Sequence, residues 1–197
     1  MALRGIDTRA AIMKSGKAAF LECGFEGASL RDICANAGVT TGALYSNFKD
    51  KDALFCAIVE DDLSDYNELY DGLLGRLTAH VAREGDSERT IMDYVIEHRD
   101  LFKLLFDCAK GSSYESFKED LLAKFDRTYQ EFFDSYATEP VDPRVVQTVV
   151  RMKFAQYCEM IYSDFDRQTV WLITDRIGDF TKAGFEALLN VKFKSPG

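Results

Sequence analysis

The chain has 197 residues, enough for one or two domains with a substantial buried core. Hydrophobic residues make up 47% and charged residues 29%, a composition that excludes an intrinsically disordered chain. No run of about 18 apolar residues is present, which argues against a membrane-spanning helix. Because the first residues also lack the apolar centre of a signal peptide, we expect a cytoplasmic protein.

The net charge of −9 lies entirely outside the first 60 residues. Residues 1–60 hold seven Lys or Arg and seven Asp or Glu, so their charges cancel. An acidic remainder would turn the N-terminal part of the molecule toward a polyanion such as DNA. The basic residues that can form a local positive face there are Arg4, Arg9, Lys14, Lys17, Arg31, Lys49 and Lys51.

The first helix is predicted over residues 7–23, with Gly24 as its end. Two short helices joined by a turn should follow. Ser29 and Asp32 form a capping-box pattern at the start of the first. Gly38 suits the left-handed position that ends it, and Thr40 or Thr41 is a natural N-cap for the second.

The second short helix, from Thr41 to about Phe48, should bury Leu44 and Phe48 one turn apart. Its polar face fits the major groove of DNA, where threonine can contact base edges and tyrosine, serine or asparagine can donate to phosphates. Lys49 and Lys51 would add positive charge. The outward residues are Thr40, Thr41, Gly42, Tyr45, Ser46 and Asn47. Without further support, an ordinary helical hairpin with a polar face remains an alternative.

Residues 12–54 resemble the N-terminal domain of tetracycline-repressor (TetR) family regulators. The matching positions are Ala19-Phe20, Gly24-Phe25, Ser29, Asp32-Ile33, Ala37-Gly38-Val39-Thr40, Gly42, Leu44-Tyr45, Phe48-Lys49, Lys51 and Leu54. Cys34 stands where alanine is usual, and Asn47 where histidine is frequent.

This resemblance implies an all-α protein with two domains. Residues 1–52 would form a three-helix, helix-turn-helix DNA-binding domain, and residues 53–197 a helical domain for effector binding and dimerisation. The implied DNA-binding residues are Ser29, Arg31, Thr40, Thr41, Gly42, Tyr45, Ser46, Asn47, Lys49 and Lys51.

Beyond this domain, a long helix is predicted from Lys51 to about Val81, followed by a loop at residues 84–87. Two short helices and one longer helix should occupy the stretch up to residue 137. The proline-containing residues 138–143 form the clearest break in the chain. The last two helices are predicted over residues 143–163 and 166–191.

Apolar residues spread over about half the circumference of each of the last two helices, more than a helix covering one side of a core needs. Either these helices are deeply buried in a monomer or they also form a dimer interface, and the TetR resemblance favours a homodimer. Two reading helices related by a two-fold axis would bind a palindromic operator in double-stranded DNA, with half-sites spaced by turns of about 34–36 Å.

The resemblance also implies a small-molecule site in the second domain, and the aromatic residues there favour a hydrophobic or aromatic effector. Its identity cannot be read from the sequence. Lys153 and Gln156 fall within the apolar arc of their helix, where they can face a ligand, pair across a dimer or extend to solvent. The candidate ligand-binding residues are Tyr94, His98, Phe102, Phe106, Phe125, Tyr129, Met152, Lys153, Gln156 and Met160.

The five cysteines have no metal-binding spacing and should be buried, reduced thiols, with Cys108 the best candidate for a redox role. With only two histidines, His80 and His98, no metal site or cofactor is expected.

Phosphate-loop and nucleophile motifs are absent, so we expect no enzyme activity. The TetR resemblance implies a ligand-released repressor. The alternative is a small-molecule-binding or protein-interaction module without specific DNA binding, favoured by the lack of Arg and Lys in residues 40–48.

Overall fold

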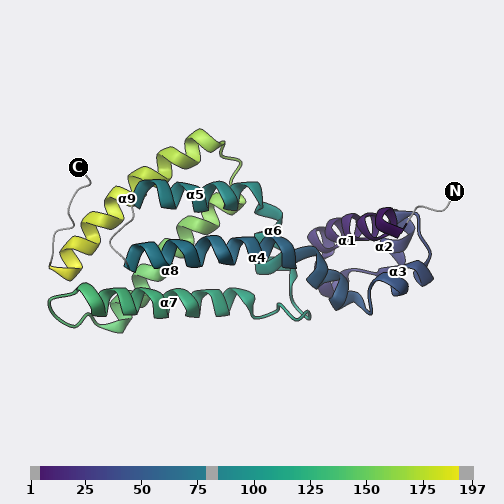
Figure 1. The fold of residues 1–197 in the computed structure, drawn as a ribbon, viewed down its shortest axis with the longest axis horizontal. Helices are drawn as coiled ribbons and strands as arrows, with labels where there is room; N and C mark the ends of the chain where they lie inside the picture. Colours follow the sequence, from purple (N-terminus) through teal and green to yellow (C-terminus); the bar gives the residue numbers. More distant parts are fainter. Residues whose placement is uncertain (1–4, 79–83, 191–197) are drawn as a thin grey trace. The chain divides into compact units, whose positions relative to one another are not determined.

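The computed structural model describes residues 5–78 and 84–190, and this part of the chain is helical with no strand (Figure 1). The all-α class expected from the sequence is therefore confirmed. The elements are α1 (Gly5–Gly27), α2 (Leu30–Ala37), α3 (Thr41–Asn47), α4 (Lys51–Thr78), α5 (Glu84–Glu97), α6 (Arg99–Lys103), the π-helical segment η1 (Leu104–Cys108), α7 (Phe117–Tyr136), α8 (Pro143–Tyr162) and α9 (Arg167–Leu189).

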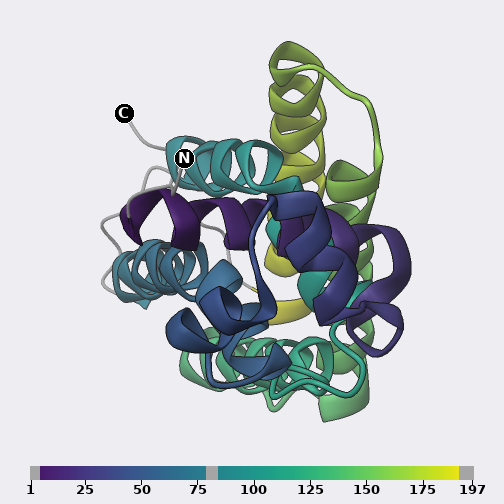
Figure 2. The same ribbon diagram turned by 90° about the vertical axis from the view of Figure 1, so that its right-hand side faces the viewer.

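These elements form two compact units. The first comprises Met1–Asp65 with Asp100–Lys118, and the second Tyr66–Arg99 with Glu119–Gly197. The helices α1, α2 and α3, coloured purple to dark blue in Figures 1 and 2, all belong to the first unit. The α6–η1 segment belongs to it as well, although about fifty residues of α4 and α5 separate that segment from α3 in the sequence.

Aromatic rings form the centre of the first unit. Phe55 of α4 contacts Phe20 and Phe25 of α1 edge-on, with ring centres 5.1 and 5.6 Å apart. Gly16 makes the approach of α1 to α4 possible, because a Cβ atom there would lie 3.1 Å from methyl carbons of Leu54 and Ile58. The backbone at Gly24 leaves the helical region, with φ of 72°, so the predicted interruption at this glycine is confirmed within α1.

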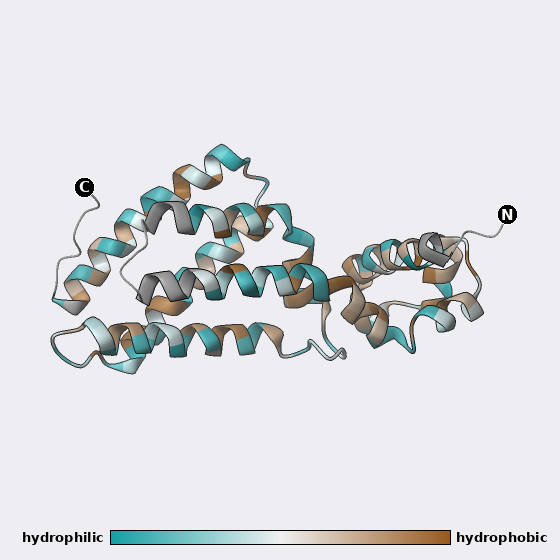
Figure 3. Ribbon diagram, viewed as in Figure 1, coloured by the Kyte–Doolittle hydropathy of each residue, from teal (hydrophilic) through white to brown (hydrophobic). Residues whose placement is uncertain are grey.

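The second unit contains the later part of α4 together with α5, α7, α8 and α9. Hydrophilic and hydrophobic residues alternate along α7 and α9, as expected for helices with one buried face (Figure 3). Phe133 of α7 packs edge-on against Phe185 of α9 at 5.1 Å between ring centres. The break at residues 138–143 is confirmed, since α7 ends at Tyr136 and Pro143 is the first residue of α8.

The predicted loop at residues 84–87 is wrong, because α5 begins at Glu84. A Gly-Asp-Ser run reads as a turn when taken alone, but acidic residues are also favoured in the first turn of a helix, where they meet the positive end of its dipole. The predicted end of the long helix near Val81 lies outside the described residues; α4 is described as far as Thr78. No described helix is long and apolar enough to span a bilayer.

Candidate nucleic-acid interface and ligand site

The α2–α3 hairpin is built by local capping. The Ser29 hydroxyl accepts a hydrogen bond from the backbone N–H of Asp32 at 3.4 Å and so caps α2. Gly38 ends α2 in the left-handed region, with φ of 68°. Of the two threonines that could cap α3, Thr40 does so, because its hydroxyl accepts from the backbone N–H of Ala43 at 3.1 Å. These caps fix where both helices begin and end.

One face of α3 is buried and the other is open. Leu44 is fully buried and Phe48 nearly so, which confirms the predicted inward pair. On the open face, Tyr45 is 60% exposed. The remaining exposed residues of this stretch are Thr40, Thr41, Gly42 and Ser46. An open polar helix face without a bulky aliphatic side chain can approach base edges closely.

Arg9 of α1 fixes the C-terminal end of α3. Its guanidinium donates to the carbonyl oxygen of Asn47 at 3.2 Å, and its central carbon lies 4.4 Å from the centre of the Phe48 ring. A cation at the C-terminal end of a helix also interacts favourably with the helix dipole. The sequence placed Arg9 on a positive face, and the structure gives it this additional contact.

The two lysines that follow α3 differ in their surroundings. Lys49 is exposed. Lys51 is half-buried, and its Nζ donates to the carbonyl oxygens of Glu26 at 3.3 Å and Ala28 at 3.0 Å. The same ammonium lies 4.6 Å from the centre of the Phe25 ring. Lys51 therefore binds the end of α1, so Lys49 is the freer of the two to meet a phosphate.

Two of the predicted DNA-contacting side chains are engaged within α3. The Ser46 hydroxyl donates to the carbonyl of Gly42 at 2.9 Å, and the Asn47 amide donates to the carbonyl of Ala43 at 2.8 Å. These hydrogen bonds orient the two side chains in the free protein. Each side chain can replace its bond with a hydrogen bond to a phosphate oxygen. The structure gathers the predicted residues from Thr40 to Lys51 on α3 and its flanks, whereas Ser29 and Arg31 lie exposed at the start of α2.

In the second unit, the side chain of Lys153 on α8 is buried and only 7% exposed. Its Nζ lies 2.9 Å from a carboxylate oxygen of Glu88 on α5. Of the arrangements open to Lys153 from sequence, extension to solvent is therefore wrong, because the ammonium is paired inside its own chain. Three residues further along α8, the amide oxygen of Gln156 is buried and has no hydrogen-bond partner among the described atoms.

Tyr129 and Tyr157 lie near this ion pair, and Tyr66 and Tyr70 lie near Tyr157. Burial raises the pKa of each phenol, and neighbouring phenols add to the effect for two of them, so all four stay neutral at physiological pH. For Tyr129, the positive charge of Lys153 opposes the rise in pKa and the negative charge of Glu88 adds to it. The four tyrosines are Tyr66, Tyr70, Tyr129 and Tyr157.

The structure brings only part of the predicted ligand set together. Phe102 and Phe106 belong to the first unit, where their rings contact each other at 6.0 Å. Met152 is 56% exposed and so lies at the surface. The rings of Tyr94 and His98 stack on each other at 3.9 Å. The predicted residues that remain buried or half-buried on α7 and α8 are Phe125, Tyr129, Lys153, Gln156 and Met160.

Sequence reasoning missed Glu88, and its candidate ligand-binding residues did not include Tyr66 or Tyr157. Nothing local marks Glu88, because its partner Lys153 lies 65 residues further along the chain. A lysine inside an apolar helical arc was the available signal, since such a charge needs a buried counter-ion. Among the described residues, no three His, Cys, Asp or Glu side chains gather as a metal site.

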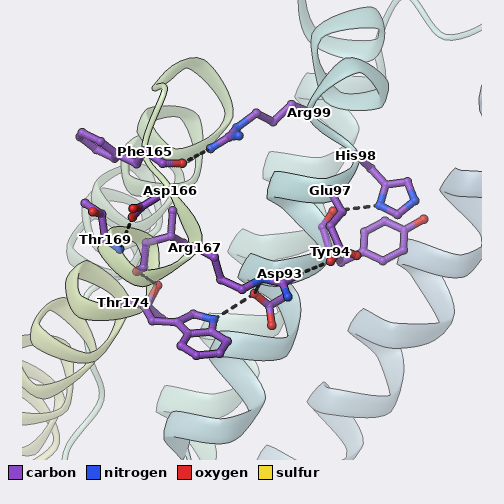
Figure 4. Close-up of polar contacts among 12 residues, drawn as sticks. Asp93, Tyr94, Glu97, His98, Arg99, Phe165, Asp166, Arg167, Thr169 and Thr174 are labelled. Carbon is purple, nitrogen blue, oxygen red and sulfur yellow. Dashed lines mark hydrogen bonds and ion pairs between the residues drawn. The ribbon is translucent and has the colours of Figure 1, made fainter.

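Polar contacts join α5 to the start of α9 (Figure 4). The Asp93 carboxylate accepts from the indole N–H of Trp171 at 2.9 Å and lies 3.1 Å from the Arg167 guanidinium. The Arg99 side chain donates to the carbonyl oxygen of Phe165 at 2.9 Å, and the Asp166 carboxylate caps α9. The two contacts of Asp93 hold α5, the helix that also carries Glu88, against the start of α9.

A helix-turn-helix unit combined with a helical second unit defines a class of DNA-binding regulators. Residues 12–58 match the model of "Bacterial regulatory proteins, tetR family". The resemblance seen in the sequence is therefore confirmed over these residues.

One curated relative is the uncharacterized HTH-type transcriptional regulator YdgC of Bacillus subtilis (strain 168). It is 29% identical over 112 residues, which cover 54% of this chain and 56% of that protein. The chain therefore spans about half the length of this curated relative.

Solved structures share the fold over most of the chain. A transcriptional regulator (TerR/AcrR family) from Aquifex aeolicus VF5 has a TM-score of 0.64 and 14% identity, covering 88% of this chain and 99% of that one. AibR, solved in complex with isovaleryl coenzyme A and operator DNA, has a TM-score of 0.56 and 17% identity, covering 92% and 98%. At these identities the likeness concerns the fold alone.

Proposed function

We propose that this protein is a sequence-specific, DNA-binding transcriptional regulator whose affinity for a palindromic operator is changed by a small molecule. The open face of α3 supports this proposal most directly. It offers polar side chains and a glycine at the surface of a helix that caps at both ends hold in place. The matched relative carries the name of a transcriptional regulator, which supports a binding function rather than catalysis.

In this proposal α3 enters the major groove. The hydroxyl and methyl groups of Thr40 and Thr41 meet base edges, and the Tyr45 hydroxyl donates to a phosphate. Lys49 supplies the charge that neutralises a further phosphate. Because the first 60 residues carry no net charge, this local arrangement rather than the charge of the whole chain attracts DNA.

The proposal requires a dimer, since one seven-residue helix contacts few bases. The last two helices offer the surface for it. On α9, Leu172 is 59% and Phe180 64% exposed, and Met152 is exposed on α8. Apolar side chains of this size favour burial against a second copy of the same surface, as a two-fold interface needs. The wide apolar arcs predicted from sequence thus divide into a part buried in the monomer and a part left for a partner.

The effector site is proposed in the second unit. AibR shows that a protein of this fold can be solved with an acyl coenzyme A and operator DNA bound together. An effector that prefers one arrangement of the second unit would change operator affinity through α4, which contributes residues to both units. A coupling of about 1–3 kcal/mol corresponds to a roughly 5- to 150-fold change. We propose that the effector releases a repressor from its operator. A bacterial regulator that acts on DNA works in the cytoplasm.

Affinity for a mixed-sequence duplex, measured by fluorescence anisotropy over a range of salt concentrations, tests the DNA-binding step. We expect micromolar or weaker affinity that falls steeply with salt. Tyr45→Ala should weaken it, whereas Tyr162→Ala, which removes an exposed tyrosine of the second unit, should not. Binding that ignores both salt and Tyr45 would favour the alternative function, a helical ligand-binding or protein-interaction module without specific DNA binding.

A further inference from the structure

The buried ion pair between Lys153 and Glu88 is expensive to maintain. Removing both charges from water costs free energy that their mutual attraction does not reliably return, so such a pair is weak evidence of a stabilising role. Three helices contribute to its surroundings. Lys153 comes from α8 and Glu88 from α5, while Gly178 of α9 leaves room for the carboxylate, since a Cβ atom there would lie 3.1 Å from the second oxygen of Glu88.

Gln156 adds a second unusual feature on the same face of α8. Residues three positions apart on a helix are neighbours, so Gln156 lies beside Lys153. Its amide oxygen is buried, yet no described atom donates a hydrogen bond to it. A buried acceptor without a donor costs free energy that a bound O–H or N–H group would recover.

Aromatic rings line the region around these polar groups. Phe125 stacks on Tyr70, with ring centres 5.1 Å apart, and approaches Tyr157 at 6.2 Å. Burial raises the pKa of the Tyr129 and Tyr157 phenols, yet both residues, like Gln156, keep some accessible surface. These three side chains are therefore less completely packed than the fully buried core residues of this unit.

We propose that this cluster binds an uncharged aromatic molecule that donates an O–H or N–H hydrogen bond to the amide oxygen of Gln156. This inference rests on the proposed effector function and specifies the chemistry of that site. The flat rings of Tyr129 and Tyr157, which keep some accessible surface, select an aromatic partner, because such rings attract one another beyond simple burial. The vacant acceptor on Gln156 selects a donor, as a phenol or an arylamine provides.

The charges of the cluster favour a neutral ligand over an aromatic acid. Lys153 and Glu88 cancel each other, and the four phenols are neutral. An incoming carboxylate would place a second negative charge beside Glu88, and the single ammonium of Lys153 cannot neutralise two buried carboxylates. A carboxylate also offers no donor to Gln156.

Calorimetric titration of the full-length protein with 2-naphthol, 2-methoxynaphthalene and 2-naphthoate tests the proposal. The first two probes differ in one donor hydrogen, and the third carries a charge. We expect 2-naphthol to bind at least about ten-fold more tightly than either of the others, since a site with a buried acceptor discriminates against a ligand that lacks the donor.

Variants of α8 assign the preference to one residue. Gln156→Leu should bind 2-naphthol and 2-methoxynaphthalene equally, while Gln147→Leu, the same substitution at an exposed position of that helix, should keep the preference. Gln156→Met provides a second variant without an amide should the leucine side chain disturb folding, which circular dichroism would reveal. A preference that survives loss of the Gln156 amide would overturn the proposal.

Equal binding of the three probes, no binding of any of them, or tighter binding of 2-naphthoate would each contradict the proposal as well. The same protein preparations are assayed for salt-dependent DNA binding. DNA binding without a preference for 2-naphthol rejects this inference and leaves the proposed regulator intact. The preference without DNA binding supports the site and rejects the regulator.

Discussion

Lys49 and Lys51 carry the same charge two residues apart but have different roles in the structure. Lys51 donates to two carbonyl oxygens near the end of α1 and lies over the Phe25 ring, whereas Lys49 is exposed. Sequence reasoning grouped both as phosphate contacts, because spacing along a helix start does not reveal which carbonyl groups another helix will place nearby. The contacts of each side chain in the folded unit separate the two lysines.

The substitutions Lys49→Met and Lys51→Met should therefore have different effects. Lys49→Met should leave the free energy of unfolding unchanged within about 0.5 kcal/mol and reduce the slope of log affinity against log salt by about one. Lys51→Met should lower the free energy of unfolding by about 1 kcal/mol, because two carbonyl oxygens lose a charged donor. Urea unfolding and salt-dependent anisotropy measure the two effects.

Lys110→Met is the matched control, since it removes the same charge from an exposed position in the first unit. It should change neither property appreciably. Equal stability of the Lys49 and Lys51 variants would contradict the structural role given to Lys51.

At the scale of elements, the hairpin of α2 and α3 could be predicted because its signals are local. Ser29, Gly38 and Thr40 each act within a few residues of their position. Long-range features could not be predicted in this way. No periodicity shows that α6 and η1 pack with the first unit, or that Glu88 pairs with Lys153.

Gly38→Ala tests the turn between the two helices. A left-handed backbone with φ of 68° disfavours a side chain, so the variant should lose about 1 kcal/mol of unfolding free energy. Gly72→Ala is the opposite control, because Gly72 lies within α4 with open space around it and should gain up to about 1 kcal/mol. Thermal unfolding of the two variants measures the expected loss and the expected gain of stability. A stabilised Gly38→Ala variant would show that the turn is not left-handed.

The attachment of α5 to α9 should weaken in acid. The Arg89 side chain donates to the Asp175 carboxylate at 2.8 Å and lowers the pKa of that group below its ordinary value. A carboxyl group whose pKa is lower in the folded state stabilises the protein above its ordinary pKa near 4, and this stabilisation is lost as pH falls through the lowered value. Because the pair is partly exposed, the effect is at most about 1 kcal/mol.

Asp175→Asn should thus be less stable than the unaltered protein at pH 7, with the difference shrinking toward pH 3. Urea unfolding at both pH values measures this change. Asp179→Asn, at an exposed position four residues further along α9, is the control and should show little difference. A stability difference for Asp175→Asn that stays constant with pH would argue against the ion pair as its cause.

At the scale of the whole molecule, exposed apolar residues on α8 and α9 complete the proposed regulator. Buried residues of these helices, such as Val150 and Val170, explain only part of the apolar arcs predicted from sequence. Exposed Phe180 and Leu188 account for another part and suit a two-fold interface. The sequence left a buried monomer helix and a dimer helix as alternatives, since an apolar arc does not state which other surface covers it.

Phe180→Glu should convert a dimer to a monomer, because a charge placed at the centre of an apolar interface is costly to bury. Sedimentation equilibrium measures the mass, and affinity for the operator should fall at least about 100-fold. Ala123→Glu, which adds the same charge at an exposed position of α7, should leave both unchanged. A Phe180→Glu variant that remains dimeric would show that the dimer interface lies elsewhere on the protein.

Selection of bound duplexes from a random DNA pool tests most directly whether two copies of the α3 surface read DNA together. We expect enrichment of a palindrome whose half-sites lie about one turn of DNA or a multiple apart, with two or a larger even number of chains bound per site. Tyr45→Ala should reduce the enrichment. A pool that stays random, or a single unrepeated motif bound by one chain, would contradict a dimeric, sequence-specific regulator.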